Sequence, residues 1–248
     1  MDKIAIISDI HGNITALKAV LQDIKRREIS RIFCLGDIIG KGPLPEVAVD
    51  IIKNACEKVV KGNWDAFITE DKCFNIEIGQ WITNKLGSDR LDYLMNLPLY
   101  IEFYMSGKLI RLFHATAEDV YKRIQMSASV EEKLSMFMAP VLKEDSINKN
   151  SDVVGYGDIH NAYVQYFREK ILFNVGSVGN PLDIKQASYA VLEGIFDKRE
   201  EDSLSVNIVR VPYDIEKAIE EAKNENMPEL TEYIDELRSG RYRGLSKK

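Results

Sequence analysis

The chain contains three histidines, and each of them follows a short apolar run. His11 ends the tripeptide Asp9-Ile10-His11, His160 ends Asp158-Ile159-His160, and His114 stands alone. Imidazole and carboxylate groups are common ligands of divalent metal ions in proteins. A single Asp-x-His tripeptide is more often a turn or a surface pair, so only the combination with other motifs points to metal chemistry.

Two dipeptides follow apolar runs in the same way. Gly36-Asp37 and Gly62-Asn63 are ordinary turn sequences when each is taken alone. Parallel strands bring their carboxyl ends to one edge of a sheet, where ligand-binding groups collect. We therefore expect the histidines and these strand-end residues to meet at one edge of one sheet and to form a metal site.

The segments that must position these residues alternate in the first third of the chain. Residues 3–7, 31–35 and 58–61 are typical of strands, whereas residues 14–24 and 46–54 carry apolar side chains at helical spacing. Strands that alternate with helices predict a parallel sheet.

The pattern of the later half differs, because short strand-like runs follow one another with turns between them. We expect strands at 153–156, 163–168, 171–175, 188–196 and 204–211, paired as antiparallel hairpins in a second sheet. Helical segments are expected at about 65–96 and 117–142, where they would cap a cleft or cover a sheet edge. The acidic segment 214–237 is expected to be helical, and it carries no recognisable chemistry.

The ordered motifs resemble those of the calcineurin-like metallophosphoesterase superfamily, whose pattern is D-x-H, G-D, G-N-H-[D/E], a single H and G-H-x-H. In this chain they are Asp9-Ile10-His11, Gly36-Asp37, Gly62-Asn63-Trp64-Asp65, His114 and Gly157-Asp158-Ile159-His160. Residues 36–43 and 174–181 further resemble a bacterial subgroup of small phosphoesterases similar to diadenosine tetraphosphatases. The resemblance covers about residues 3–195.

This resemblance implies an α/β fold, an αββα sandwich of two mixed sheets flanked by helices. It implies one metallophosphoesterase domain over residues 1–248, with a helical cap around 115–150. The implied activity is hydrolysis of phosphoester or phosphoanhydride bonds in small molecules, with nucleotides or dinucleoside polyphosphates expected. Hydroxide held by two divalent ions ~3.5–4 Å apart would attack the phosphorus atom. We expect Mn²⁺ or Fe²⁺, with Mg²⁺, Ni²⁺ and Zn²⁺ as further candidates.

The resemblance also implies a role for each motif residue. Asp37 would bridge the two ions, and Asp37, Asn63 and His114 would be catalytic. The ligands of the first ion would be Asp9, His11 and His160, and those of the second Asn63, His114 and Asp158.

Two positions depart from the superfamily pattern. Asp158 replaces a histidine, and a hard carboxylate ligand favours Mn²⁺, Mg²⁺ or Fe²⁺ at the second site. Alternatively, Asp158 is not a ligand and the second site is weak or empty. Trp64 replaces a histidine that assists the leaving group, and an indole either packs there or forms a wall on which an aromatic group stacks. Asp65, which would orient that histidine, is then expected to cap a helix.

Basic residues near the motifs are candidates for contact with the phosphates of a substrate. Lys41 follows the bridging aspartate, while Lys122 and Arg123 follow His114. Lys41 and Arg123, with Trp64, are the substrate-binding candidates, although a solvated surface charge is the ordinary state of such residues. The basic residues at 238–248 are expected to be a solvated, frayed terminus rather than an anchor for an acidic partner.

Composition narrows the class of protein. The chain has 248 residues, of which 45% are hydrophobic, and a net charge of −6, which disfavours nucleic acid as a ligand. The longest apolar run has seven residues, at 136–142, so no membrane span is expected. Three cysteines without C-x-x-C spacing and an N-terminus without a signal pattern predict a cytoplasmic protein.

The partner of the protein would be a small phosphorylated substrate, and the oligomeric state is open. The main alternative is a non-catalytic metal-binding scaffold, as in the retromer subunit of this superfamily; a nuclease is disfavoured.

Overall fold

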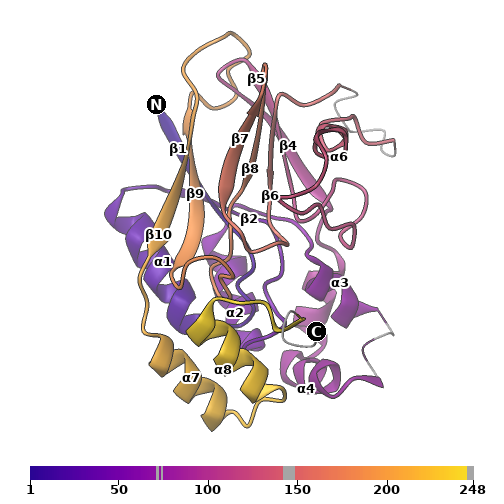
Figure 1. Cartoon of the computed structure of the whole chain (residues 1–248), viewed down its shortest axis with the longest axis vertical. Coiled ribbons are helices and arrows are strands. Elements are labelled where there is room, and N and C mark those ends of the chain that lie inside the picture. Colours follow the sequence, from indigo (N-terminus) through magenta and orange to yellow (C-terminus); the bar gives the residue numbers. More distant parts are fainter. Residues whose placement is uncertain (71–72, 74, 142–148, 245–248) are drawn as a thin grey trace.

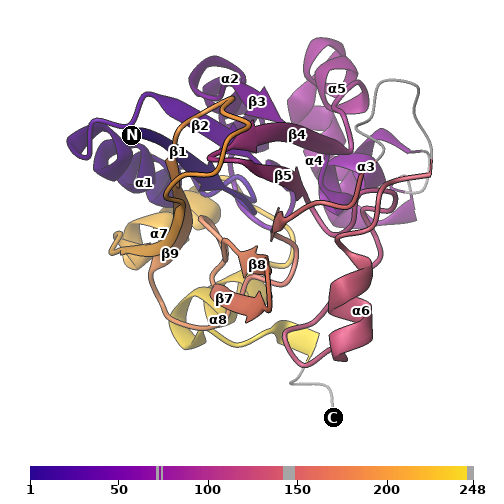
Figure 2. The ribbon, with the colours of Figure 1, turned by 90° about the horizontal axis from the view of Figure 1, so that it is seen from above.

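Two five-stranded sheets lie against each other, and helices cover their outer sides (Figures 1 and 2). The computed structural model describes residues 1–70, 73, 75–141 and 149–244. Between the sheets, one apolar cluster joins residues of both, such as Ile6 and Phe33 from the first sheet with Leu112 and Phe173 from the second. The predicted αββα sandwich is confirmed.

The first sheet has the strand order β10-β9-β1-β2-β3. Its parallel part is β1 (Asp2–Ile7), β2 (Arg31–Cys34) and β3 (Lys58–Val59). Strand β9 (Ala187–Gly194) pairs antiparallel with β1, and β10 (Ser205–Val211) pairs antiparallel with β9. Both faces of β1 are buried, with Ile4 and Ile6 toward the second sheet and Ala5 and Ile7 toward the helices. This explains why β1 is a continuous apolar run instead of an alternating one.

Helices α1 (Ile14–Arg26) and α2 (Pro45–Ala55) connect the parallel strands and pack on the outer face of the first sheet. In α1, Leu17, Val20 and Ile24 recur at helical spacing and are buried against the sheet. The side chain of Asn13 caps α1 by accepting a hydrogen bond from the backbone N–H of Ala16 at 3.0 Å. The alternation of strands and helices predicted for this part of the chain is confirmed.

The second sheet is mixed, with the order β4-β5-β6-β8-β7. Its strands are β4 (Tyr100–Met105), β5 (Lys108–Phe113), β6 (Val153–Tyr156), β7 (Tyr163–Phe167) and β8 (Lys170–Asn174). Strand β6 pairs in parallel with both β5 and β8, whereas β4 with β5 and β7 with β8 are antiparallel hairpins. The sequence analysis assigned no range to the β4–β5 hairpin.

Further helices surround the sheets. Helices α3 (Asn63–Thr69), α4 (Glu77–Leu86) and α5 (Ser88–Met95) follow β3, while α7 (Ile215–Asn224) and α8 (Leu230–Ser239) end the described chain. Helix α6 (Val130–Ser135) lies on the outer face of the second sheet. No helix among the described residues is both long and apolar enough to cross a membrane.

Two expectations are wrong. The later strands do not all belong to the second sheet, because β9 pairs with β1 and β10 with β9, so both extend the first sheet. The helix expected at 117–142 is limited to the short α6 within the described residues 117–141, while Leu142 lies outside them. Apolar residues in this segment, such as Ile124 and Phe137, pack on the second sheet from loops and turns, so their spacing does not require a helix.

Candidate metal centre

The motif residues meet at one end of the sandwich, and they come from both sheets. Asp9 and His11 follow β1, Asp37 follows β2 and Asn63 begins α3 after β3, whereas the remaining motif residues follow β5 and β6 of the second sheet: His114, Asp158 and His160. The expectation of one edge of one sheet is therefore wrong. The backbone N–H of Asp158 donates to Asp9 Oδ2 at 3.1 Å, which joins the strand-end loops of the two sheets.

An unusual backbone conformation directs these side chains. Five of them have positive φ angles near 50–60°, where non-glycine residues are uncommon: Asp9 (55°), His11 (50°), Asp37 (49°), Asp158 (63°) and His160 (59°). Each such residue costs about 1–3 kcal/mol, and such strain clusters at functional sites. The strand-end loops therefore hold a local strain that serves to turn the side chains toward a common point.

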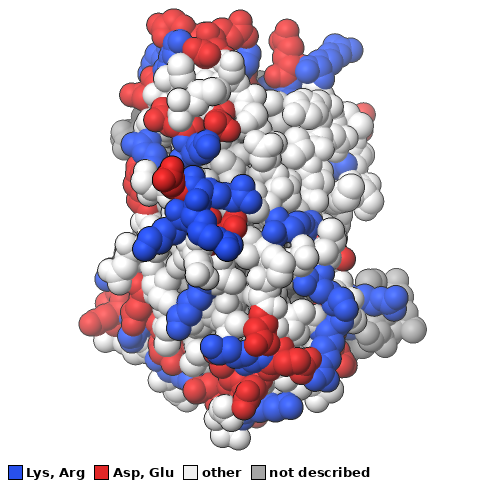
Figure 3. Space-filling view, turned by 90° about the vertical axis from the view of Figure 1, so that its left-hand side faces the viewer, with Lys and Arg blue, Asp and Glu red and all other residues white. Residues whose placement is uncertain are grey.

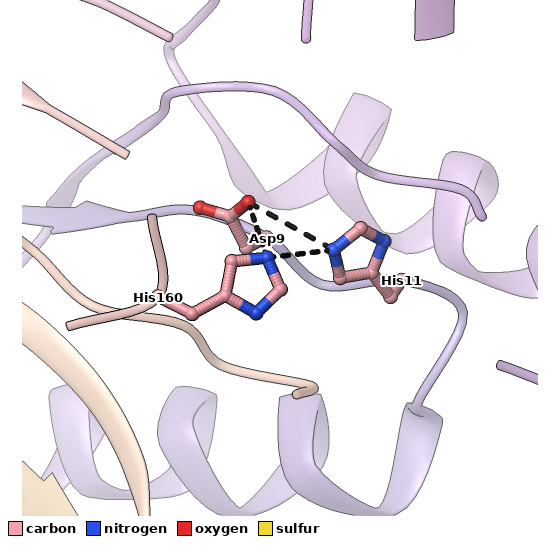
Figure 4. A group of neighbouring side chains, drawn as sticks. All are labelled: Asp9, His11 and His160. Carbon is pink, nitrogen blue, oxygen red and sulfur yellow. Dashed lines mark hydrogen bonds and ion pairs between the residues drawn. The ribbon is translucent and has the colours of Figure 1, made fainter. Parts of the chain in front are cut away.

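Asp9, His11 and His160 form the first cluster (Figure 4), with one possible ligand atom from each within 4.8 Å of the others. His160 Nε2 lies 3.1 Å from Asp9 Oδ1, and His11 Nε2 lies 3.8 Å from the same oxygen. The two Nε2 atoms are 3.1 Å apart. All three side chains are buried, so water competes little for these atoms.

The hydrogen bonds of the histidines test whether a metal ion suits this arrangement. Nδ1 of His11 faces the carbonyl of Ile39 at 3.1 Å, and Nδ1 of His160 faces the carbonyl of Asn180 at 2.5 Å. A carbonyl only accepts, so each Nδ1 carries a proton, and in the neutral imidazole the Nε2 then presents a lone pair. Asp9 Oδ1 is also buried without a hydrogen-bond donor. The two Nε2 atoms and Asp9 Oδ1 thus converge with too few hydrogen-bond donors to satisfy them all. A divalent cation would stabilise this arrangement.

A second cluster joins Asp9 and Asp37 to His114, again within 4.8 Å. His114 Nε2 lies 3.5 Å from Asp37 Oδ1 and 2.9 Å from Asn63 Oδ1, and its Nδ1 donates to the carbonyl of Leu35 at 2.8 Å. The other oxygen of Asp37 is 3.7 Å from His11 Nε2. Asp37 therefore lies between the histidines of the two clusters, the geometry that a bridging carboxylate needs.

Burial and mutual charge shift the pKa values of these groups. Burial is the largest cause that raises the pKa of Asp37 well above its usual value, and the nearby Asp9 carboxylate adds to it. Burial lowers the pKa of His114, but the carboxylates around it more than offset this and raise it to about 9. Burial also lowers the pKa of His11 well below its usual value, so this imidazole is neutral. Metal ligands must be deprotonated, so a bound ion would displace the protons that these shifts favour on Asp37 and His114 in its absence.

Asp158 has a different environment from the other ligand candidates. Both of its oxygens accept hydrogen bonds at 2.9 Å from the guanidinium of Arg123, in the fork geometry typical of arginine and carboxylate. Its Oδ1 is also 3.8 Å from His114 Nε2. Asp158 therefore borders the second cluster, while its charge is balanced by Arg123.

Asp65 holds two of the loops in place. Its Oδ2 accepts a hydrogen bond at 2.9 Å from the backbone N–H of Gly62 at the start of α3, which confirms the predicted helix cap. Its Oδ1 accepts from the N–H groups of Ile38 and Ile39 at 3.1 and 3.4 Å. Asp65 thereby fixes the loop after Asp37 against the start of α3.

Gly62 allows the close approach of these two loops. A Cβ atom at position 62 would lie 2.1 Å from the backbone nitrogen of Asp37 and 2.2 Å from its Oδ1, distances that no side chain can occupy. The backbone N–H of Trp64, two residues later, donates to the same Oδ1 at 2.8 Å. The Gly62-Asn63 dipeptide is thus required to orient the Asp37 carboxylate.

Trp64 both packs and lines the pocket. Its ring meets His11 edge to face with 6.4 Å between the ring centroids, and it meets Phe67 in the same way at 5.9 Å. The side chain is partly buried and forms part of a pocket of about 840 Å³ beside the clusters. The structure therefore combines the two interpretations of Trp64, a packing residue and a wall of the site.

The basic residues predicted to contact the phosphates of a substrate differ in their position relative to the pocket. Lys41 and Arg123 both line the pocket, and Lys41 Nζ donates to Asn180 Oδ1 at 2.9 Å. Lys122 is exposed and is not part of the pocket lining.

Sequence analysis missed a group of residues near the end of the chain. Arg241, Tyr242 and Arg243 line the pocket, and Glu236, in the segment expected to lack chemistry, is fully buried. The expected solvated, frayed terminus is therefore wrong for Arg243, which pairs with Glu236 at 3.0 Å, whereas Arg241 is exposed as expected. Lys247 and Lys248 lie outside the described residues. A lone Glu within an acidic helix gives no sequence signal of this role.

Comparison with known proteins agrees with the site. The family description of the calcineurin-like phosphoesterase superfamily domain matches residues 2–194. An uncharacterized protein of Methanocaldococcus jannaschii is 34% identical over 91% of this chain and 94% of its own length.

Solved structures share the fold. A metallophosphoesterase from Sphaerobacter thermophilus superposes with a TM-score of 0.73 at 24% identity, over 96% of this chain and 99% of that one. A hypothetical protein from Pyrococcus horikoshii superposes with a TM-score of 0.78 at 22% identity, over 98% of this chain and 100% of that one. Both similarities cover more of this chain than residues 2–194, the part that the family description matches.

Proposed function

Because the chain belongs to the calcineurin-like phosphoesterase superfamily, we propose that it is a dinuclear metal-dependent hydrolase of small phosphorylated molecules. One observation carries this proposal: two buried clusters of ligand atoms share Asp9, and Asp37 lies between their histidines. Nucleotides and dinucleoside polyphosphates are the first substrate candidates. We also still predict that the chain forms a single domain and that the protein is cytoplasmic.

The residues divide between two ions in this proposal. Asp9, His11 and His160 would hold one ion, Asn63 and His114 the other, and Asp37 would bridge them. When bound, two such ions hold a phosphoryl group, balance the charge that develops on it and lower the pKa of a bound water molecule. We propose Mn²⁺ or Fe²⁺, since the set mixes imidazole with hard oxygen ligands.

The protein's own contribution is to present these groups preorganised. The carbonyls of Ile39 and Asn180 orient His11 and His160 through Nδ1, so that in the neutral imidazoles Nε2 is free to bind. The carbonyl of Leu35 holds the His114 ring in the same way, with its Nε2 toward Asn63 and Asp37. The N–H of Trp64 fixes one oxygen of Asp37. These contacts set the ligand positions before a substrate arrives, which lowers the cost of reorganisation in the transition state.

The absence of a histidine at position 64 bears on the substrate. An indole cannot donate a proton to the departing oxygen, so substrates whose leaving groups are stable anions would be favoured. Phosphoanhydrides and aryl esters meet this requirement, whereas alkyl monoesters do not. This supports nucleotide polyphosphates over sugar phosphates as the substrate class.

A metal-supplemented substrate screen tests the proposal. The purified protein would be stripped with a chelator, reloaded separately with each candidate ion, and assayed on phosphomonoesters, phosphodiesters and dinucleoside polyphosphates. We expect close to two ions per chain by elemental analysis and hydrolysis that requires them. Two bound ions without hydrolysis of any substrate would instead favour the alternative, a metal-binding scaffold of the same fold.

A nuclease is less well supported. The net charge of the chain is −6. On the face that Figure 3 shows, basic side chains gather near the middle while acidic ones gather toward both ends, so no basic tract runs along that whole face. Proteins bind the phosphate backbone of nucleic acids through a tract of basic side chains.

A further inference from the structure

The segment after α8 forms one wall of the pocket beside the candidate metal centre. Arg241, Tyr242 and Arg243 line that pocket together with Asp37 and His160. In Figure 1 the yellow end of the chain runs from α8 toward α3. The family match ends at residue 194, so this wall is not part of the matched domain.

A buried carboxylate holds the wall in place. Glu236 of α8 accepts hydrogen bonds from Arg243 Nη2 at 3.0 Å, from the Arg243 backbone N–H at 3.0 Å and from Asn180 Nδ2 at 3.1 Å. It also lies 3.6 Å from Lys41 Nζ. A fully buried carboxylate is tolerated only when it is paired and hydrogen-bonded. Glu236 therefore positions both Lys41 and Arg243 at the pocket.

Asn180 connects this wall to the metal centre. Its side-chain oxygen accepts from Lys41 Nζ, and its backbone oxygen accepts from His160 Nδ1. Lys41 is thus held within two contacts of a candidate metal ligand, with Tyr242 on another side at 5.5 Å from the ring centroid. The ammonium group of Lys41 therefore has a fixed position beside the candidate metal centre.

Arg241 differs from its neighbours, because its guanidinium has no hydrogen bond or ion pair with any described residue. It is exposed and lines the pocket. An arginine fork matches the oxygens of a phosphate in geometry and charge. A guanidinium at the pocket that has no partner among the described residues is placed to receive an anionic group of the proposed phosphorylated ligand.

We propose that Lys41 and Arg241 form a second anion subsite, which holds the phosphate chain of a nucleoside polyphosphate beyond the phosphate that reacts. This deepens the proposed function and rests on it for the position of the reacting phosphate. The pocket volume of about 840 Å³ is in the range of sites for whole small molecules, and far exceeds the needs of orthophosphate. Trp64 and Tyr242 offer aromatic faces for the base.

Equilibrium binding tests this subsite independently of turnover. Mn²⁺-loaded protein would be titrated calorimetrically with the β,γ-methylene analogue of ATP and, separately, with orthophosphate. The variants are Arg241→Gln and Lys41→Gln, with Arg238→Gln as the matched control. Arg238 lies on α8, pairs with Glu216 at 2.6 Å and is not part of the pocket lining, so this control removes the same charge outside the subsite.

We expect the wild-type protein to bind the analogue more tightly than orthophosphate. Arg241→Gln and Lys41→Gln should each reduce this preference by about tenfold, the usual scale for one charge-assisted contact. Arg238→Gln should retain the preference. The proposal is overturned if Arg241→Gln matches Arg238→Gln, or if both ligands weaken equally. Absence of hydrolysis with every substrate would refute the proposed function alone, because this readout is binding.

Discussion

Asp37→Asn should have opposite effects on stability with and without metal ions. The Asp37 side chain is 2% exposed and shares its cluster with the Asp9 carboxylate. Without metal, the buried Asp37 carboxyl reduces the free energy of unfolding in either protonation state. The ionised form loses its hydration, and the neutral form must first take up a proton. Asparagine removes that cost and keeps the oxygen that accepts from the N–H of Trp64 at 2.8 Å. The metal-free variant should therefore be more stable than the wild type.

The expected sizes follow from burial and linkage. Replacing buried ion pairs by apolar side chains is often neutral or stabilises proteins by about 1–4 kcal/mol, and we take this as the scale for removing the Asp37 charge. For a chain of this length that is a rise of at least about 2 °C in Tm. An ion present at 100 times its Kd stabilises the folded state by about 2.7 kcal/mol. The wild type should gain this for each ion, whereas the variant, without the bridging charge, should gain much less.

Calorimetric unfolding in chelator and in excess Mn²⁺, with elemental analysis of the same samples, provides the assay. The order of Tm should reverse: variant above wild type in chelator, and below it in Mn²⁺. Asp65→Asn is the control, because Asp65 accepts backbone hydrogen bonds with both oxygens and an amide NH₂ would face a donor. That variant should be less stable in both conditions. Full metal content in Asp37→Asn would refute the bridging assignment, and a less stable metal-free variant would refute the electrostatic reasoning.

Three further predictions concern the two residues that depart from the superfamily pattern, Asp158 and Trp64, and Arg123, the partner of Asp158. Asp158→His should move the metal preference of activity toward Zn²⁺ or Ni²⁺ if position 158 is a ligand, and identical metal profiles would show that it is not. Arg123→Gln should release the Asp158 carboxylate and tighten binding of the second ion in a calorimetric titration; unchanged affinity would mean that Arg123 does not compete with the metal. In the wild type, kcat/KM should depend steeply on leaving-group pKa, and Trp64→His should selectively raise kcat/KM for alkyl esters, by up to ~10²- to 10⁴-fold. A flat dependence, with chemistry shown to limit the rate, would identify another proton donor.

The positions of the metal ligands along the chain could be predicted because they follow local rules. Each motif comes directly after an apolar run, and a strand that is buried on both faces needs such a run, as β1 shows with Ile4 to Ile7. The Gly-Asp and Gly-Asn dipeptides mark turns, and the close contact of Gly62 with Asp37 explains why glycine stands there. The apolar runs and the turn dipeptides depend on neighbours in sequence, so they can be predicted without the fold, whereas the contact of Gly62 with Asp37 is seen only in the structure.

The pairing of distant strands could not be predicted in this way. Residues 187–211 have the composition of hairpin strands, and nothing local distinguishes pairing with β1 from pairing with β8. The choice depends on which edge remains free once the core between the sheets is filled. For the same reason the motifs were expected on one sheet, although His114, Asp158 and His160 reach the site from the second.

The wall formed by residues 241–243 and held by Glu236 was the part of the site least predictable from the sequence, because it depends on tertiary packing. Glu236 has the same local surroundings as the exposed acidic residues of its segment, and only the packing of α8 buries it beside Asn180 and Lys41. The same holds for Asp158, whose role is decided by the guanidinium of Arg123, 35 residues earlier in the chain. Residue type and strand-end spacing determine which atoms can bind a metal ion. Long-range packing determines which charges surround those atoms, since the free energy of a buried charge depends on partners that are close in space and distant in sequence.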